Sequence, residues 1–391
     1  MTTPASSTST AAPSRPIRLG TRGSALATTQ SGLVARRLEE LTGRPVELVR
    51  IRTEGDVRTG SLANLGGTGV FVTAVREALL DGRCDIAVHS LKDLPTRPAE
   101  GLTIVTPERE DPRDALCARD GLTLEQLPRG ARVGTGSPRR VAQLLAARPD
   151  LDVVDIRGNV DTRLNRALGP DADLDAVVLA WSGLARLGRT DVVTEALEPA
   201  VVAPAPGQGA LAVEARSEDV APGGPLAEAF AALDHRPTRL AVLAERALLA
   251  RLEAGCAAPV GTHARIVEDQ LVLGAVVART DGTEQLKHRA SVTLRRQPAA
   301  DDDAARELGV RVAEALLADG ADRLAPLAAS GTARPQQGAV DPSPTGAPGA
   351  DTEAKPASPR RAPSGDGHAR AHRDAGLDEV GTAADDPAER Q

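Results

Sequence analysis

The feature that most constrains this chain is a twofold alternation between strand-like and helix-like apolar patterns. One series covers residues 16–88, and a second series of the same kind covers residues 115–187. Strands that alternate with amphipathic helices are typical of mainly parallel sheets covered by helices. The sequence therefore predicts two α/β units of similar size.

In the first series, we expect strands at residues 16–19, 46–51 and 86–88 and helices at 25–41 and 70–80. In the second, we expect strands at 115–118, 132–134, 153–156 and 177–179 and helices at 139–147, 160–168 and 182–187. A strand pattern at 210–214 could return to the first sheet, which would make two crossings between the units. A helix from Pro237 to about Leu252, strands at 263–267, 271–278 and 288–294 and a helix near 304–318 predict a small α+β unit.

These patterns also predict domain boundaries. Residues 1–14 and 330–391 lack periodic apolar residues and are expected to be disordered, since they cannot offset the entropy of ordering. Between them we expect a first domain at residues 15–109 and 208–229, a second at 110–207 and a third at 230–329.

Composition excludes several classes of function. The net charge is -7 and aromatic residues make up 1% of the chain, so neither nucleic acid nor an anionic membrane is an expected partner. No stretch is apolar and long enough to span a bilayer, and the N-terminal residues lack a secretory pattern. Cys84, Cys117 and Cys256 have no paired spacing, which excludes a disulfide framework or a zinc knuckle. We expect a reducing cytoplasm and no metal.

The segment from Ile86 to Pro95 is the first candidate for chemistry. A buried-strand pattern runs directly into Ser90, Lys92 and Asp93, and catalytic groups of α/β proteins gather where strands end. Lys92 is one of only three lysines in the chain, so its place directly before Asp93 points to a specific role. The alternative is that both charges merely solvate a loop. Asp93 is the candidate catalytic residue.

Arginines after strand ends are the next signal. In the segment 134–140, Ser137 is a natural N-cap, Pro138 fits the first helical position, and Arg139 and Arg140 fall in the first turn. Cations there oppose the helix dipole, so the pair is unfavourable unless something negative is bound.

The same pattern recurs along the chain. Arg22 and Ser24 follow the first expected strand, and Arg157, Arg163 and Arg186 follow strands of the second series. Any one of them could be a solvated arginine. As a set they predict a polyanionic ligand in a cleft between the two α/β units.

Cys256 lies among small residues in the loop 252–261, where its sulfur could be accessible and carry a covalent group. The alternative is a small buried residue, which is what we expect of Cys84 and Cys117.

Together these residues resemble the porphobilinogen deaminase, or hydroxymethylbilane synthase, family of tetrapyrrole biosynthesis. The resemblance covers about Ile17 to Leu327 and rests on motifs at residues 20–22, 65–71, 85–93, 108–114, 133–140, 156–160, 206–210 and 251–261. It implies an α/β fold of two periplasmic-binding-protein-like domains that flank a cleft, plus a small C-terminal α+β domain. It also implies a covalent dipyrromethane cofactor, one per chain, in thioether linkage to Cys256.

The resemblance further implies that porphobilinogen units condense head to tail on this cofactor, each losing ammonia, until water releases hydroxymethylbilane. Each pyrrole carries acetate and propionate, which would account for an arginine-lined cleft in an acidic protein. Asp93 would assist protonation of the departing amine and stabilise the cationic pyrrole. Cofactor and substrate would be bound by Arg22, Ser24, Phe71, Ser90, Lys92, Ser137, Arg139, Arg140, Arg157, Arg163, Arg186 and Gln208, with Phe71 against a pyrrole and Gln208 at the hinge.

The expected partners are porphobilinogen and polypyrrole intermediates, with a monomeric protein and hand-over to the next pathway enzyme left open. Asn64 and Thr68 stand in a loop where many relatives have lysines, which puts an electrostatic role of that loop in doubt. The rival interpretation is a two-domain anion-binding protein without catalysis. Such a protein would need the arginines but neither Asp93 nor an accessible Cys256, and it would normally carry an export signal.

Overall fold

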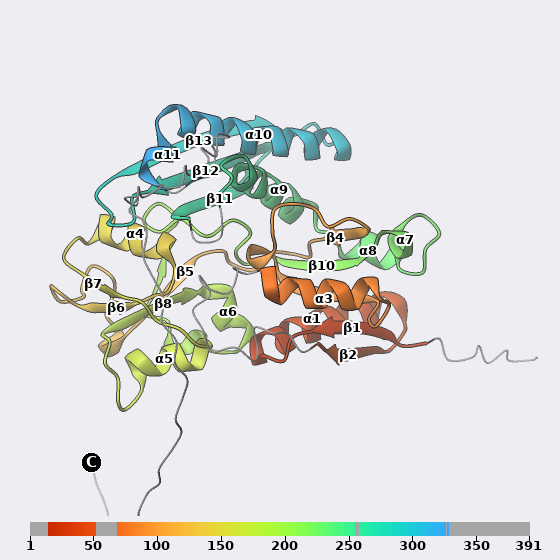
Figure 1. Ribbon diagram of the computed structural model, residues 1–391, viewed down its shortest axis with the longest axis horizontal. Coiled ribbons are helices and arrows are strands. Elements are labelled where there is room, and N and C mark those ends of the chain that lie inside the picture. The colour runs from red at the N-terminus through yellow and green to blue at the C-terminus, as the bar shows by residue number, and fades with distance from the viewer. Residues whose placement is uncertain (1–14, 52–68, 255–257, 326, 328–391) are drawn as a thin grey trace, which may run out of the picture. The chain divides into compact units, whose positions relative to one another are not determined.

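The computed structural model describes residues 15–51, 69–254, 258–325 and 327. All of them belong to one compact unit, Met1–Ala333. They form two five-stranded sheets and one three-stranded sheet with helices packed against them (Figure 1). None of the described helices is long and apolar enough to cross a lipid bilayer.

The first sheet has the strand order β2-β1-β3-β10-β4. Its strands are β1 (Ile17–Thr21), β2 (Val46–Arg50), β3 (Ile86–Ser90), β4 (Leu102–Val105) and β10 (Leu211–Arg216). β1 runs parallel to β2 and β3, whereas β10 runs antiparallel to β3 and β4. The accompanying helices are α1 (Ala25–Thr42), α3 (Gly69–Leu80), α7 (Ser217–Val220) and α8 (Ala227–Leu233). Leu19 and Val213 of this sheet pack with Leu38 of α1 and Phe230 of α8 in one core.

The second sheet repeats this pairing pattern in the order β7-β6-β8-β5-β9. Its strands are β5 (Asp114–Ala118), β6 (Arg132–Gly134), β7 (Asp152–Val154), β8 (Ala176–Ala180) and β9 (Glu195–Leu197), with helices α4 (Pro138–Ala147), α5 (Val160–Leu168) and α6 (Trp181–Arg186). β6 is parallel to β7 and β8, and β5 is antiparallel to β8 and β9. Apolar residues on both faces of this sheet are buried, which is why its strands read as continuous apolar runs.

The chain passes between the two sheets twice, through residues 106–113 and 198–210. β10 follows the second passage and pairs within the first sheet, so the predicted return of residues 210–214 is confirmed. Two buried side chains fix this region: Arg109 donates two hydrogen bonds to Glu245, at 2.9 and 3.1 Å. Glu245 also accepts the backbone N–H groups of Gly207 and Ala264, at 2.7 and 2.8 Å.

The third sheet is a meander of β11 (Val260–Val267), β12 (Gln270–Ala278) and β13 (Gln285–Thr293). Leu271 and Leu273 on one face pack against α9 (Arg236–Arg251) and α10 (Pro298–Ala318), with α11 (Ala321–Leu324) at the end. A Cβ at Gly309 of α10 would collide with the carbonyl oxygen of Ala244 of α9, so glycine is needed where these helices cross. The opposite face of the sheet lacks this helical cover.

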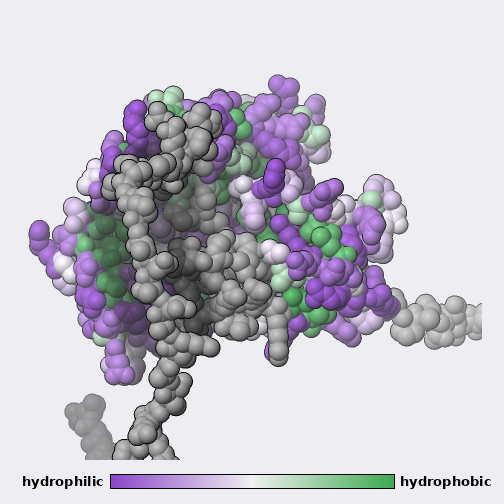
Figure 2. All heavy atoms as spheres, in the orientation of Figure 1, coloured by the Kyte–Doolittle hydropathy of each residue, from purple (hydrophilic) through white to green (hydrophobic). Residues whose placement is uncertain are grey.

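The structure confirms the predicted α/β, α/β and α+β classes and most element positions within a few residues. The sequence patterns missed two short edge strands, β4 and β9, and the helices α7, α8 and α11. On the face seen in Figure 2, hydrophilic side chains predominate and apolar ones gather in smaller areas.

Candidate functional site

The candidate residues lie after the carboxyl ends of parallel strands. Arg22 and Ser24 follow β1, Lys92 and Asp93 follow β3, Arg139 and Arg140 follow β6, and Arg157 follows β7. The carboxyl ends of parallel strands lie at one edge of a sheet, where α/β proteins bind their ligands. Each sheet therefore presents its candidate residues along one edge.

Asp93 lies in a 3-10 turn, η2 (Leu91–Asp93), directly after β3. Its side chain is exposed, and no other described residue forms a hydrogen bond or ion pair with its carboxylate. Leu91, the first residue of the turn, is buried and anchors it. Ser90 exchanges hydrogen bonds with Gln30 of α1, at 3.2 and 3.3 Å. The turn therefore holds a free carboxylate in a defined place.

Lys92 lies half-buried beside Asp93 and reaches toward the second sheet. Burial lowers the pKa of Lys92 to about 8, although the charge of Asp93 opposes this shift. Its ammonium group donates to Oε1 of Gln208 at 3.4 Å. Gln208 is fully buried, and its amide donates to Oδ1 of Asp114 at 2.8 Å. A chain of contacts thus links the two α/β sheets through the second crossing.

Arg139 and Arg140 are buried, and the negative charge beside them is supplied by the protein itself. Nη1 of Arg139 lies 2.7 Å from Oδ2 of Asp114, and Nη2 of Arg140 lies 2.7 Å from Oδ1. Burial alone would raise the pKa of Asp114, but the two guanidinium groups outweigh it and lower the pKa well below its usual value. The first-turn arginines were predicted to face a bound anion, whereas the negative charge that the structure places beside them is Asp114 of the chain itself.

The two predicted capping serines differ. Ser24 caps α1 as expected, accepting the N–H of Ala27 at 3.3 Å. Ser137 occupies the N-cap position of α4 as expected, but its side chain makes no capping hydrogen bond. Its backbone N–H instead donates to Oγ1 of Thr135 at 3.3 Å. Pro138 does occupy the start of the helix.

Three further arginines complete the cluster. Arg157 is exposed and contacts Asp155 at 3.3 Å. Arg163 is half-buried, and its pKa is lowered by burial and by the charges of Arg140 and Arg157. Arg186 donates to the carbonyl oxygen of Gly209 at 2.5 Å, and burial also lowers its pKa.

Several predicted residues lie outside the described part of the chain. These are Cys256, Asn64 and Thr68, and of Phe71 the structure describes the helical backbone alone. The two other cysteines are free and buried, as expected. Burial raises the pKa of Cys117 to about 12 and also raises that of Cys84.

Sequence reasoning missed the residues that support the site. The sequence patterns predicted no role for Asp114. An acidic residue at the start of an otherwise apolar strand could have indicated a buried, paired carboxylate. Glu214 of β10 is also fully buried. Its Oε1 lies 2.7 Å from Nη2 of Arg76 of α3, and its Oε2 lies 3.1 Å from Nε2 of His89 of β3. Such partners are far apart in the sequence, so only the fold brings them together.

The site fits an acidic ligand. Among the described residues, the Nε atoms of Arg163 and Arg186 are buried without a hydrogen-bond partner. Buried donors of this kind are costly unless a ligand satisfies them. The cations around Lys92, Arg140 and Arg163 outnumber the nearby carboxylates Asp93, Asp114 and Asp155. The described residues contain no group of acidic, histidine or cysteine side chains that could hold a metal ion.

Comparisons with known proteins agree with this arrangement. Residues 17–222 match the family model "Porphobilinogen deaminase, dipyromethane cofactor binding domain", and residues 239–318 match "Porphobilinogen deaminase, C-terminal domain". The porphobilinogen deaminase of Micrococcus luteus is 54% identical over 355 residues, covering 79% of this chain and 94% of the relative. That of Leifsonia xyli subsp. xyli is 56% identical over 313 residues, covering 80% of this chain and 94% of the relative.

Among solved structures, a periplasmic substrate-binding protein of an ABC transporter from Coxiella burnetii is 17% identical with a TM-score of 0.35. The similarity covers 59% of this chain and 94% of that protein.

Proposed function

The chain belongs to the porphobilinogen deaminase family, and from this premise we propose that it condenses four porphobilinogen molecules head to tail on a dipyrromethane primer. Ammonia leaves at each step, and water finally releases hydroxymethylbilane. The observation that carries the proposal is the pairing of two features of the described residues: an exposed Asp93 that has no partner among them, and arginines with unsatisfied buried donors.

The arginine cluster would hold the acetate and propionate groups of cofactor and substrate. Arg163 and Arg186 each keep a buried Nε donor that a carboxylate could satisfy. Arg139 and Arg140 share Asp114, so the two positive charges are only half neutralised within the protein. When bound, the dipyrromethane supplies the pyrrole carbon at which the new bond forms. Arg22, Ser24, Ser90, Phe71, Ser137 and Arg157 belong to the same proposed binding set.

Asp93 would perform the proton chemistry. A carboxylate fixed by a short turn at a strand end can assist protonation of the departing amine and then stabilise the positive pyrrole nitrogen. Lys92, with a pKa of about 8, is mostly protonated at neutral pH and can bind a substrate carboxylate beside it. Gln208 contacts both Lys92 and Asp114 and would keep the two sheets in register during elongation.

Cys256 is the proposed point of cofactor attachment. The two other cysteines are poor nucleophiles, because burial raises the pKa of each thiol. Protein purified from cells should exceed its sequence mass by two linked pyrrole units, and the excess should map to Cys256. Cys256→Ser should remove it, because a hydroxyl is a weaker nucleophile than a thiolate. A fully active protein without added mass would refute this attachment.

The domain boundaries given above, a cytoplasmic location and a monomeric state belong to the same proposal. The separated, unpaired thiols Cys84 and Cys117 support a reducing compartment. Light scattering on the purified protein tests the monomer. A non-catalytic anion-binding protein remains the alternative, and the absence of ammonia release from porphobilinogen would favour it.

A further inference from the structure

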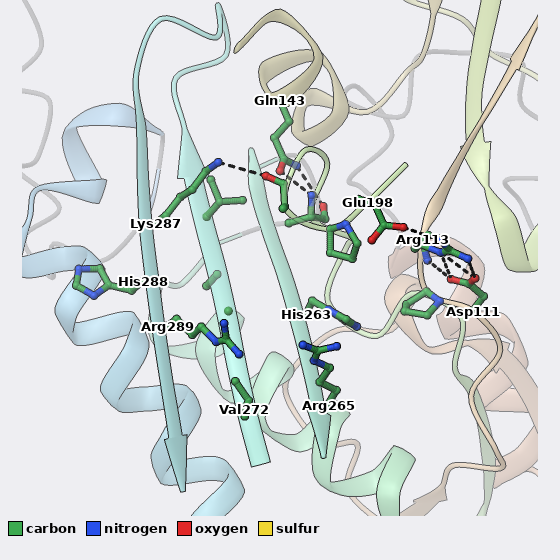
Figure 3. Close-up of a pocket in the computed structure, with 17 residues that line it drawn as sticks. Asp111, Arg113, Gln143, Glu198, His263, Arg265, Val272, Lys287, His288 and Arg289 are labelled. Atoms are coloured by element: carbon green, nitrogen blue, oxygen red, sulfur yellow. Dashed lines mark hydrogen bonds and ion pairs between the residues drawn. The ribbon is translucent and has the colours of Figure 1, made fainter. Parts of the chain in front are cut away.

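A cavity of about 590 Å³ lies on the face of the third sheet that α9 and α10 leave uncovered (Figure 3). Its other walls come from residues 111–113 before β5 and residues 198–203 after β9. None of the candidate residues of the first site lines it. A volume of this size is ordinary for a small-molecule site, which typically measures about 300–1,000 Å³.

Two arginines on the sheet face have unused donors. The strand register places Arg265 of β11 opposite Val272, and places Arg289 of β13 and His263 of β11 opposite Gly274. Both arginines are exposed, and neither forms a hydrogen bond or ion pair with another described residue. Figure 3 shows the side chains of Arg265 and His263 lying near one another beside the sheet.

A third cation lies at the edge of the cavity. Lys287 of β13 donates only to the carbonyl oxygen of Ala200, at 3.5 Å. The acids on the opposite wall are already engaged, since Arg113 binds Asp111 at 2.7 Å and Glu198 at 2.8 Å. His288 adds no charge to the cavity, because it turns away and contacts Asp319 at 2.6 Å. The cavity therefore holds more positive charge than its own walls neutralise.

Apart from Gln143, whose amide is bonded to the backbone of Ala203, the rest of the lining is apolar. Pro112, Pro199 and Ala200 form one wall, and Val272 and Val276 lie on the sheet beside Gly274. A Cβ built on Gly274 would meet only the carbonyl oxygen of His263, at 3.9 Å, so the floor is open at its centre. An apolar ring can lie on this floor, whereas a fully hydrated anion would gain nothing from the apolar walls.

We propose that this cavity is a second ligand site for a small anion that combines a flat apolar ring with two or more carboxylates. Arg265 and Arg289 lie two strands apart and two residues apart in register, a backbone separation of about 12 Å, so their forked donors can bind carboxylates on opposite sides of one ring. The ligand would contact the third sheet and both segments that cross between the other two sheets. This site is separate from the proposed function and does not depend on it.

Benzene-1,3,5-tricarboxylate is a suitable probe, titrated into the purified holoenzyme by calorimetry. Binding at this site should be lost, or weakened at least tenfold, in the double variant Arg265→Gln/Arg289→Gln. It should also be lost in Gly274→Val, which fills the floor but keeps every charge and suits a strand. Arg295→Gln, an exposed arginine outside the cavity, is the matched control and should bind like the unchanged protein.

The outcomes separate the parts of the proposal. Probe that binds at the first site would still bind in all these variants. The double variant and Gly274→Val should therefore bind one probe molecule fewer per chain than the unchanged protein, and their turnover of porphobilinogen should be unchanged. Equal binding by the unchanged protein and Gly274→Val would overturn the site. Pyrophosphate or citrate binding here as tightly as the ring compound would overturn the ring, because the cavity would then recognise charge alone. No binding of any of the three anions would overturn the proposal as a whole.

Discussion

Asp93 and Asp114 are both aspartates placed at the edge of a sheet, one in each α/β half, and their surroundings are opposite. Asp93 is exposed and makes no hydrogen bond or ion pair with another described residue. Asp114 is fully buried and accepts hydrogen bonds from Arg139, Arg140 and Gln208. The difference fits the proposed division of labour, in which Asp93 takes part in the reaction and Asp114 organises the cations proposed to bind the substrate.

The two sheets share a pairing pattern, so the difference does not come from topology. It comes from the position of each aspartate relative to the neighbouring strand. Asp114 is the first residue of the interior strand β5 and contacts Arg139 and Arg140 of α4, whereas Asp93 lies in a turn beyond the end of β3. A buried carboxylate between two guanidinium groups stays charged and is poorly suited to exchange protons.

Asp114→Asn should have the largest effect on folding. The change leaves two buried guanidinium groups without a negative partner, which costs about 3–5 kcal/mol in comparable buried pairs. We expect urea unfolding to show this loss together with failure of cofactor assembly. Asp93→Asn is the matched control and should change the free energy of unfolding by less than about 0.5 kcal/mol. An Asp114→Asn protein as stable as the control would remove the distinction between the two aspartates.

The same ion pair predicts a dependence on acid. The folded-state pKa of Asp114 is lower than the unfolded value, so its stabilising contribution is present above about pH 4 and is lost as the pH falls further. Asp114→Asn should lose this part of the acid dependence.

Arg140→Leu should have a smaller effect, of about 2–3 kcal/mol, since charged hydrogen bonds to Asp114 are lost but Arg139 remains. The helix dipole alone had predicted no loss of stability for this change, and the buried pair with Asp114 reverses that expectation. Cofactor assembly or chain elongation should also fail. Arg157→Leu, at an exposed position, serves as the control in thermal unfolding. Equal melting temperatures for the two variants would mean that Asp114 does not need Arg140.

Lys92 tests the link between the two halves. Its ammonium group should titrate near pH 8, because burial disfavours the charged form. The unfolded state then binds more protons between about pH 8 and 10.4, so this residue's contribution to stability rises with pH in that window. Isotopic dimethylation followed by NMR can resolve it, since the chain has only three lysines. A midpoint above pH 10 would show that Lys92 is not buried against the second sheet.

The smallest effect is expected from ending the chain after Ser330. Residues 331–391 lack the apolar content of a core, so melting temperature and turnover should both stay close to the full-length values. A large fall in either value would mean that these residues contribute to the fold.

The sequence was sufficient for elements with a clear period. α5 begins and ends at the predicted residues, and the arginines that follow β6 and β7 lie where expected. The edge strands β4 and β9 were missed because three or four residues carry little periodicity and, unlike the equally short β6, neither is followed by a helix with a recognisable start. Local pattern thus predicted elements better than it predicted sheet edges.

The supporting contacts of the site could not be predicted in the same way. Dipole reasoning predicted a bound anion near Arg139 and Arg140 and could not show that Asp114, 25 and 26 residues away, lies against both. The low pKa of Lys92 likewise depends on burial against Gln208, which follows it by 116 residues. Charge pairing between distant segments is a property of the fold, not of local sequence.

The most direct test of the account is ammonia release and tetrapyrrole formation by Asp93→Asn and Asp93→Glu at saturating porphobilinogen. If the free carboxylate carries the chemistry, Asp93→Asn should lose about a hundredfold or more in turnover while remaining folded and binding substrate. Asp93→Glu keeps the charge on a longer arm and should retain measurable but lower activity. Near-normal turnover by Asp93→Asn would contradict the account and place the catalytic group elsewhere.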